Sequence, residues 1–501
     1  MKRIYFCFFI LIFSTFSNGQ SIDEVLNLIR DNSVGTARYQ SMGGAFGALG
    51  GDLSAMNINP ASSSVFNDNQ YGFTIAVEKK SNKSIFFNNS VNQNDNKFSI
   101  SQGGGVWLFK NSADGKINKI AFGFNAQTNS SFNNSILIKG RNLSSSIDKY
   151  FINNSEGLSL TDLSVGNDEN VSGVYKYLGE YYGNSAQHAF LAFQSYLIDY
   201  DQNTNTFFSN AKYNNGVDQK HLRDSKGVNS KYNFNISLQV KDDFYFGLNI
   251  NTHDILIENH TVHNETNFDS DSAIKSIKYE NSLITQGEGF SIQLGAIAKF
   301  KSMRFGLSYQ SPTWYTLIDE TFQFIEVNSI DLNGVNYRDI VDPRVINVYP
   351  KYNLRTPSNI TTSAAFIFGK KGLFSIDIIS RDYSKVKLKP NNEFLNLNKD
   401  FNTNLSNSID VKLGSEYRIN NLSLRGGYTK IGSPYPNSQI MKNSYSQSFG
   451  LGYDFGDTLI NFSYQSLNSE KNNQLFDSGL TDSAQTKTKQ SISSFSIIFK
   501  F

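Results

Sequence analysis

The sequence predicts an all-β fold, a fourteen-stranded antiparallel transmembrane barrel, and three observations support this prediction. Hydrophobic residues make up only 39% of the 501 residues, whereas aromatic residues reach 14%. Charged residues amount to 18%, and Asn, Ser, Thr, Gln and Gly fill much of the remainder. From residue 69 onward, apolar and polar residues alternate with a period of two, and the links between the alternating segments are short and long in turn. This combination is typical of a closed barrel in a membrane.

The first nineteen residues predict a secretory signal. Lys2 and Arg3 precede an apolar run, and small residues follow it at 17–19. The only cysteine, Cys7, lies inside that run, so we expect a mature chain without disulfides or cysteine-bound metal. No later window approaches eighteen consecutive apolar residues, so the sequence predicts no transmembrane helix. A closed β-barrel is then the available way to span a membrane.

An N-terminal segment, residues 20–68, differs from the rest of the chain. Ser21 and Glu24 have the spacing of a capping box and predict a short helix at 22–30. A segment dense in glycine and alanine follows at 35–61, where small side chains allow other backbone to approach closely. It ends in Asn-Pro-Ala, in which proline fixes φ and asparagine favours a turn.

Period-two alternation predicts fourteen strands between residues 69 and 501. It is clearest near the C-terminus, where Ile460, Phe462 and Tyr464 point to one face and their neighbours to the other. Seven long loops and six short links alternate, as in barrels with external loops and periplasmic turns. The expected strands are 70–79, 97–109, 117–131, 229–240, 244–258, 286–300, 304–314, 356–368, 372–384, 406–418, 422–431, 444–455, 458–469 and 488–501. The expected long loops are 80–96, 132–228 with a helix at 186–200, 259–285, 315–355, 387–405, 432–443 and 470–487.

The chain ends in an aromatic residue on an apolar face. Phe501 follows Phe499, Ile497 and Phe495 at alternate positions. A terminal aromatic of this kind is similar to the sorting signal that the barrel-assembly machinery recognises in bacterial outer-membrane barrels. We therefore expect the outer membrane of a Gram-negative bacterium. An ordinary sandwich strand is the alternative, and the signal segment and the loop alternation disfavour it.

The stretch ARYQSMGGAFGALGGDLSAMNINPA, residues 37–61, resembles the FadL family of outer-membrane transporters for long-chain fatty acids and other hydrophobic compounds. The fourteen strands and the terminal aromatic fit the same family, and further local similarity lies in 287–300, 304–315 and 352–377. The resemblance implies a barrel plugged by an N-terminal hatch, without enzyme activity or cofactor. It also implies passive uptake of hydrophobic molecules such as fatty acids, captured in the lumen and released sideways through the wall into the membrane.

Three sets of residues are the candidate sites. We assign the hatch or gate to Gly43, Gly44, Gly47, Asn59, Pro60 and Ala61. Glycine interrupts strand packing and often marks a bulge, so we assign a weak point in the wall to Gly103, Gly104 and Gly105. We expect that valine in place of all three leaves the barrel folded and reduces uptake. A cluster of lumen-facing polar residues comprises Asp377, Arg381, Lys412, Glu416 and Arg425.

Two interpretations of the polar cluster remain open. In one, the charges pair with each other and hold the wall to the hatch, because buried charges require partners. In the other, Arg425 or Lys412 contacts a ligand carboxylate, for which an arginine is well suited.

Several other functions are disfavoured. A net charge of +2 gives no basic field for nucleic acid. The spacing of Gly44, Gly47 and Gly50 suggests a nucleotide loop, but no strand precedes it and no Gly-Lys-Ser/Thr follows. We expect His260 and His263 on opposite faces of a strand in a solvated external loop, and no metal site. No serine, histidine and carboxylate set indicates a phospholipase.

Rival functions from other classes also remain. The long loop 132–228 favours a barrel that docks secreted proteins, some members of the group carry a haem-receptor label, and an aromatic compound is another possible cargo. An open polar porin would require a free channel. We expect a monomer in contact with outer-membrane lipid.

Overall fold

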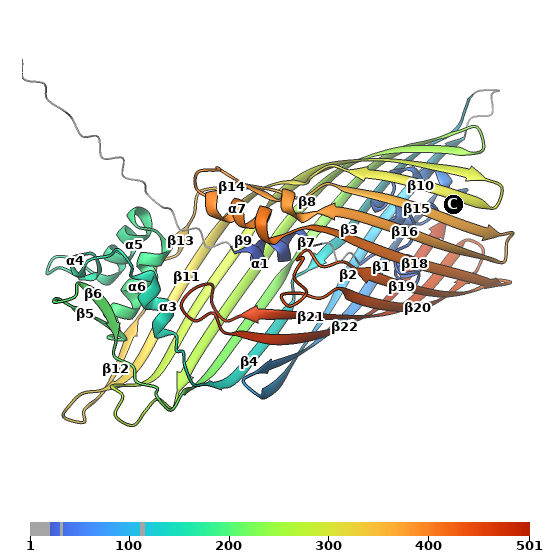
Figure 1. Cartoon of the computed structure of the whole chain (residues 1–501). Coiled ribbons are helices and arrows are strands. Elements are labelled where there is room, and N and C mark those ends of the chain that lie inside the picture. The colour runs from blue at the N-terminus through green and yellow to red at the C-terminus, as the bar shows by residue number, and fades with distance from the viewer. Residues whose placement is uncertain (1–20, 31–33, 111–115) are drawn as a thin grey trace, which may run out of the picture.

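A computed structural model describes residues 21–30, 34–110 and 116–501, which form a closed, fourteen-stranded antiparallel barrel (Figure 1). The fold predicted from the sequence is confirmed. The expected signal at 1–19, with Cys7, and most of the short link at 111–116 lie outside the described residues. In the part of the chain that is described, no helix is both long and apolar enough to cross a membrane.

Each wall strand pairs antiparallel with its neighbours, and the last strand closes the ring against the first, from Gln70 opposite Lys500 to Ile85 opposite Gln485. Three wall strands are interrupted and carry two labels each. In ring order the wall consists of β1 (Gln70–Phe86), β2 (Asn89–Lys110), β3 (Ile117–Ser131) with β4 (Asn134–Asn142), β7 (Val217–Val240), β8 (Phe244–Thr266), β9 (Ile274–Phe300), β10 (Met303–Gln310) with β11 (Trp314–Ile330), β14 (Tyr352–Arg355) with β15 (Asn359–Phe368), β16 (Gly372–Asp382), β18 (Asn407–Ile419), β19 (Leu422–Ile431), β20 (Ser444–Asp454), β21 (Thr458–Gln474) and β22 (Ser483–Lys500).

The remaining elements belong to the hatch or to the external end. The hatch contains α1 (Ile22–Ile29), α2 (Ala37–Ser41) and the 3₁₀ turns η1 (Leu53–Asn57) and η2 (Pro60–Val65). The external end contains α3 (Asp148–Asn154), α4 (Leu160–Leu163), α5 (Val171–Tyr181), α6 (Asn184–Gln194), β5 (Ile198–Asp201), β6 (Thr206–Ser209), β12 (Asn336–Val341), β13 (Asn347–Val348), η3 (Tyr383–Lys385), β17 (Lys387–Lys389) and α7 (Leu395–Asn404).

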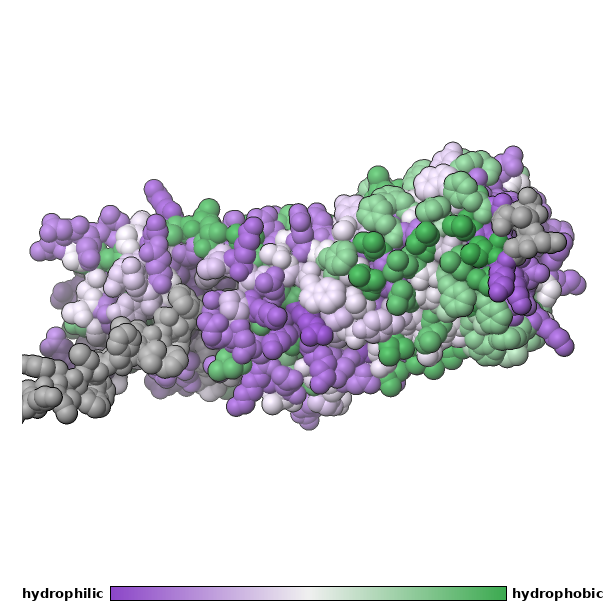
Figure 2. All heavy atoms as spheres, turned by 90° about the horizontal axis from the view of Figure 1, so that it is seen from above, coloured by the Kyte–Doolittle hydropathy of each residue, from purple (hydrophilic) through white to green (hydrophobic). Residues whose placement is uncertain are grey.

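The outer surface carries an apolar belt on the half of the barrel nearer the short turns, whereas the half with the helices is hydrophilic (Figure 2). On β1 the outward Tyr71, Phe73 and Val77 are exposed, while the inward Thr74 and Ala76 are buried. Exposed apolar side chains in a continuous band are stable only against hydrocarbon. The belt therefore marks the membrane-spanning half.

The strands extend well beyond the belt, and the expected loops 80–96 and 259–285 are wrong in extent. Residues 80–96 form the end of the β1–β2 hairpin, which turns at Phe87 and Asn88. Most of 259–285 belongs to β8 and β9, and β9 alone has 27 residues, against about 9–11 needed to cross a membrane. Above the belt the outward face is hydrophilic, and the apolar residues of β9, such as Ile277 and Tyr279, lie instead on the inward face against the external cap.

The expected loop 132–228 is also shorter than predicted, because β4 and the outer part of β7 pair with each other at its two ends. Residues 143–216 remain as a compact unit, which we name the external cap. Its helix α6 ends at Gln194 instead of the expected residue 200, because Tyr196 has a positive φ of 56° and β5 follows. The buried Tyr175 and Phe190 of the cap pack in one cluster with Tyr279 of β9.

Candidate functional site

The hatch lies inside the barrel, with α1 nearer the external end and the glycine-rich part nearer the short turns (Figure 1). The predicted capping box is confirmed: the Glu24 backbone N–H donates to Ser21 Oγ at 3.3 Å, and the Ser21 N–H donates to Glu24 Oε2 at 2.9 Å. The apolar side of α1, with Val25 and Leu26 buried, packs among aromatic and aliphatic residues of the lumen. The helix therefore covers the space between the glycine-rich part and the outside.

The candidate hatch glycines are positions where a side chain would not fit. Gly43 and Gly44 end α2 with φ values of 62° and 71°, in the left-handed region that favours glycine. Gly47 donates its N–H to the buried Asp377 carboxylate at 2.9 Å. A Cβ on Gly47 would lie 2.0 Å from Ser363 Oγ. These residues let the hatch backbone lie directly against the wall.

Asn59 connects the hatch to itself and to the wall. Its Oδ1 accepts from the Ala61 N–H at 3.1 Å, which begins η2, and its Nδ2 donates to the carbonyls of Gly47 at 2.7 Å and Ala296 on β9 at 3.0 Å. Pro60 occupies the start of η2, and its carbonyl accepts from Asn235 Nδ2 at 2.8 Å. Asn-Pro-Ala is therefore a joint between the hatch and the strands.

Wall side chains satisfy the hatch backbone on many sides, and the sequence analysis did not identify them. The signal was present as polar residues at inward positions of the strands. The hatch carbonyls and their donors are Leu49 with Arg304 Nη1 (2.6 Å), Ala45 with Ser375 Oγ (2.7 Å), Gly43 with Thr429 Oγ1 (3.0 Å), Met56 with Asn249 Nδ2 (2.8 Å), Ile58 with Gln293 Nε2 (2.9 Å) and Phe66 with Lys119 Nζ (2.6 Å).

A set of wall glycines, also missed from the sequence, makes room for the hatch. A Cβ on any of them would lie within 2.0 to 2.7 Å of a hatch atom. The set consists of Gly123, Gly247, Gly295, Gly306, Gly414, Gly427 and Gly450.

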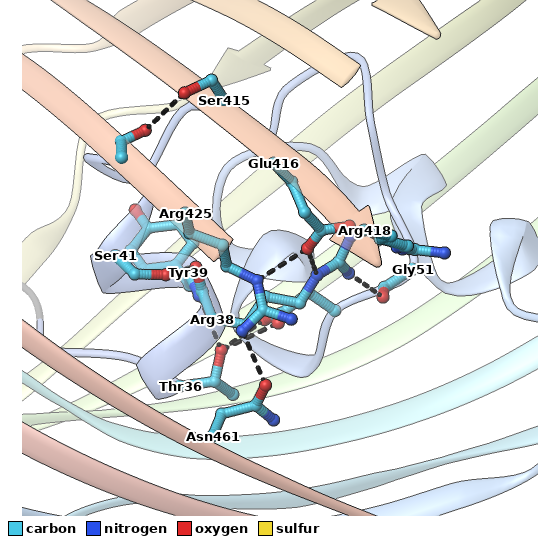
Figure 3. A network of polar contacts seen from close by, with 12 residues as sticks. Thr36, Arg38, Tyr39, Ser41, Gly51, Ser415, Glu416, Arg418, Arg425 and Asn461 are labelled. Carbon is cyan, nitrogen blue, oxygen red and sulfur yellow. Dashed lines mark hydrogen bonds and ion pairs between the residues drawn. The ribbon is translucent and has the colours of Figure 1, made fainter. Parts of the chain in front are cut away.

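The polar cluster is centred on Glu416, whose side chain is fully buried (Figure 3). Its carboxylate contacts Arg38 Nε of the hatch at 2.9 Å, Arg425 Nε at 2.7 Å and Arg418 Nη2 at 2.6 Å. Arg425 also donates to Asn461 Oδ1 at 2.7 Å. Because Arg38 comes from the hatch and the other groups from β18, β19 and β21, this network ties hatch and wall together.

Of the other predicted members of the cluster, Arg381 and Lys412 line a small lumen cavity, whereas Asp377 contacts Gly47 of the hatch. Arg381 pairs with Asp410 at 2.7 Å, and both line the cavity. Lys412 lines it as well, with its Nζ 5.9 Å from the centre of the Tyr39 ring. Arg425 does not line the cavity, so Lys412 is the better placed of the two cations proposed for a ligand carboxylate. That role stays a prediction.

The lumen cavity has a volume of about 110 Å³ and lies where the hatch meets strands from both sides of the barrel. Most of its lining residues are polar, and four aliphatic wall residues, Ile379, Ile431, Leu467 and Ile492, lie among amide and charged side chains. Gln127 and Asn129 bring the cavity to the edge of β3.

The wall is incomplete at this edge, and we name the gap the seam. Backbone pairing between β2 and β3 stops at Gln102 opposite Gln127, although β2 continues outward to Asn89. Both strands carry an extra residue there, Ser101 in β2 and Asn129 in β3, as the register with their other neighbours shows. The outward Ile100 beside the bulge is 72% exposed, so the seam lies at belt level.

Side chains close the seam where the backbone ladder is missing. Lys97 Nζ of β2 donates to Asn133 Oδ1 at 3.1 Å, and Lys80 Nζ of β1 donates to the Asn133 carbonyl at 2.6 Å. Such contacts can break one by one, whereas a strand ladder opens cooperatively.

The three predicted wall glycines lie next to the seam but differ from one another. Gly103 has open space beside it, whereas a Cβ on Gly104 would lie 2.4 Å from the Phe124 carbonyl oxygen. The expectation that all three tolerate valine is therefore wrong for Gly104, because that side chain would push β3 away.

The expected external loop is wrong, because His260 and His263 both lie on the paired strand β8; the His260 side chain is half-exposed, whereas His263 is buried. His263 lies on β8, is fully buried, and contacts His221 at 3.2 Å and Glu265 at 3.0 Å. His260 is on the same strand, and its Nδ1 shares a hydrogen bond of 2.8 Å with Ser282 Oγ. Burial lowers the pKa of His221 well below its usual range. Among the described residues, no group of three or more His, Cys, Asp or Glu could hold a metal ion.

Comparison with solved structures finds similar outer-membrane channels. A FadL homologue from Pseudomonas aeruginosa superposes with a TM-score of 0.54 at 12% identity, over 94% of this chain and all of that chain. The chain has the FadL fold. The toluene transporters TodX of Pseudomonas putida and TbuX of Ralstonia pickettii align over 94% and 93% of this chain at 13% identity, with TM-scores of 0.49 and 0.48 and 99% and 98% of their own lengths covered. No protein-family model matches the sequence, and no curated protein does.

At these identities the FadL fold is what the comparison shows. The plugged lumen and the interrupted wall are observed in the structure of this chain itself and do not depend on the similar structures.

Replacing Gly427 by valine should prevent the hatch from seating, because the new side chain would lie 2.3 Å from the Gly43 nitrogen. We expect single-molecule conductance in planar bilayers to rise severalfold. The matched control is Gly426→Val on the same strand, where a Cβ meets only Ser415 Oγ at 3.6 Å. Equal conductance in the two variants would contradict a close-fitting hatch.

Replacing Glu416 by glutamine should leave three arginines without their shared counter-charge. We expect the free energy of unfolding to fall by about 3–5 kcal/mol, measured by denaturant titration in detergent micelles. The control is Glu326→Gln, whose partner Arg338 is exposed, and which should cost about 0–1 kcal/mol. Similar losses in both variants would argue against a structural role for the buried network.

Acidification should weaken the external cap. Burial lowers the pKa of His188 to about 3, with Nδ1 held by Tyr150 Oη at 2.8 Å. Since the unfolded histidine has a pKa near 6.5, the unfolded state binds more protons between pH 6.5 and 3 and stability falls as pH falls, by roughly 1.4 kcal/mol per pH unit. Hydrogen exchange in α6 should accelerate at pH 4.5, and His188→Gln should remove that part of the pH dependence.

Proposed function

We propose that this protein is a passive channel of the outer membrane that takes up hydrophobic molecules, with long-chain fatty acids as the favoured class. The ligand enters from the external end, is held in the lumen above the glycine-rich part of the hatch, and leaves sideways through the seam into the membrane. The apolar belt supports a membrane location. No energy source is required, because the ligand moves down its gradient.

The observation that carries this proposal is the seam. A barrel whose lumen is blocked by a hatch needs another exit, and the β2–β3 ladder ends at belt level where Gln127 and Asn129 bring the cavity to the wall. An exit into hydrocarbon suits a ligand with a large apolar part.

The cavity lining supports a ligand with a polar head over a bare hydrocarbon. Lys412 and Arg381 line the cavity together with several amides, so a carboxylate would find charge-assisted donors there. The same cavity also has aliphatic wall residues, Ile379, Ile431, Leu467 and Ile492, which an apolar chain would contact. A fatty acid combines both requirements.

Removing the wall bulge tests the exit. Deleting Ser101 should let β2 continue in regular register with β1 and narrow the seam, and we expect uptake of radiolabelled oleate by proteoliposomes to fall at least tenfold. The control is deletion of Lys275, the extra residue of a β9 bulge outside the belt. Unchanged oleate uptake in the Ser101 deletion, with the barrel folded, would reject the seam as the exit. Parallel uptake of toluene separates an aromatic cargo from a fatty acid.

A second candidate function is docking of secreted proteins by the external cap. Three neighbouring tyrosines of the cap, Tyr177, Tyr181 and Tyr182, are 51%, 64% and 41% exposed. The ring of Tyr177 contacts the rings of the other two. Tyrosine is enriched at protein interfaces. Deleting residues 143–216 would abolish partner binding and spare oleate uptake if docking is a separate function. A haem receptor is less well supported, because His221 and His263 are buried against each other.

A further inference from the structure

The outer wall carries a basic concavity on the side where the barrel closes. It has a volume of about 910 Å³ and lies against the outward faces of β1, β20, β21 and β22 beside residues 432–443. We name it the lysine groove. Its charged lining residues are Lys83, Lys442, Lys487, Lys489 and Glu470.

The lysines of the groove lie close together although their positive charges repel each other. Lys83 on β1 is directly opposite Lys487 on β22, and like charges at opposed positions destabilise a sheet. Lys489 is two residues along β22 from Lys487, on the same outward face and nearer the belt, and is opposite Ser81. The one carboxylate, Glu470, contacts Lys442 Nζ at 2.6 Å and is directly opposite Lys487 on the β21 side. One negative charge therefore faces four positive ones.

The groove begins four residues further out along the strands than the Val77 row of the apolar belt. Val77 and Tyr464 are both opposite Ser493 and are exposed residues of the belt on this side. Lys489 lies four residues further out than Ser493, about 13 Å along the strand. Tyr445 is at the level of Lys489, because both residues are opposite Asn468 on β21. The Tyr445 side chain is 44% exposed. An exposed tyrosine at this level is typical of the membrane interface.

We propose that the lysine groove binds the phosphate-bearing headgroup of a lipid in the external leaflet. Compact ammonium groups are point-charge partners for phosphate, and a bridging phosphate would relieve the repulsion between Lys83 and Lys487. The belt lies below the groove on the same strands, so the acyl chains of the same molecule would lie against Val77, Tyr464 and Phe449. This continuity favours a lipid over a free anion. The charged residues of the groove lie on the outward faces of the strands, and its inner wall is formed by Tyr435 and Met441, which also pack in the cluster around α1.

The test compares lipid binding by full-length protein in detergent, measured by native mass spectrometry with lipid A, which has two phosphates. The groove variant is Lys83→Gln, Lys487→Gln and Lys489→Gln together. Its matched control is Lys176→Gln, Lys212→Gln and Lys226→Gln, three exposed lysines of the external end that each have an acidic partner. A third variant replaces the three groove lysines by arginine and keeps the charge.

We expect wild type, control and arginine variant to retain one lipid A, and the glutamine groove variant to bind it at least tenfold more weakly. Higher salt should weaken the interaction. Equal binding by the groove variant and the control would overturn the proposal. Displacement of lipid A by inorganic phosphate at equimolar concentration would also overturn it, because the groove would then be a site for free anions.

Discussion

The structure depends on one constraint: the backbone of the hatch must find hydrogen-bond partners inside a closed barrel, because its own regular structure is short. The glycine-rich part contains one five-residue helix and two 3₁₀ turns, so many of its carbonyls have no partner within the hatch. Inward side chains of the wall supply the donors, among them Arg304, Asn249 and Gln293. The high content of Asn, Ser, Thr and Gln thus has a structural purpose in the lumen.

The same constraint determines how closely hatch and wall approach. Short hydrogen bonds from wall to hatch backbone require small residues on both sides, and wall glycines such as Gly295 and Gly306 face Asn59 and Gly47 of the hatch. The Glu416 network adds ionic contacts between the two parts. A hatch held in this way is a poor moving gate, which is why our account places the exit in the wall.

The sequence was sufficient to predict the fold class, the fourteen strands and the capping box, because apolar alternation and helix capping are local patterns. It could not predict the parts of strands above the belt, because 80–96 is mostly polar and the apolar residues of 259–285, such as Ile277 and Tyr279, pack against the cap instead of facing lipid. The buried position of His263 was likewise hidden, since it depends on β8 pairing with β7 and on Ser146 and Ile147 of the cap contacting Glu265.

The candidate site was predicted in part. Asn59, Gly47 and Glu416 were identified by their pattern or charge, and the structure places all three at contacts between hatch and wall. The seam was approached through Gly103–Gly105, but its bulges at Ser101 and Asn129 arise from strand register, which no single segment encodes. Wall glycines were overlooked because a glycine on a strand is informative only when its neighbour across the lumen is known.

Hydrogen exchange of the membrane-embedded protein during oleate uptake tests the central claim most directly. The comparison is between the hatch, residues 36–66, and the seam segment of β3 at 128–131, with β21 as reference. A fixed hatch predicts that 36–66 exchanges as slowly as β21 while 128–131 exchanges faster and responds to oleate. Rapid exchange of 36–66 when oleate is present, with 128–131 as protected as β21, would contradict the account and make the hatch the gate.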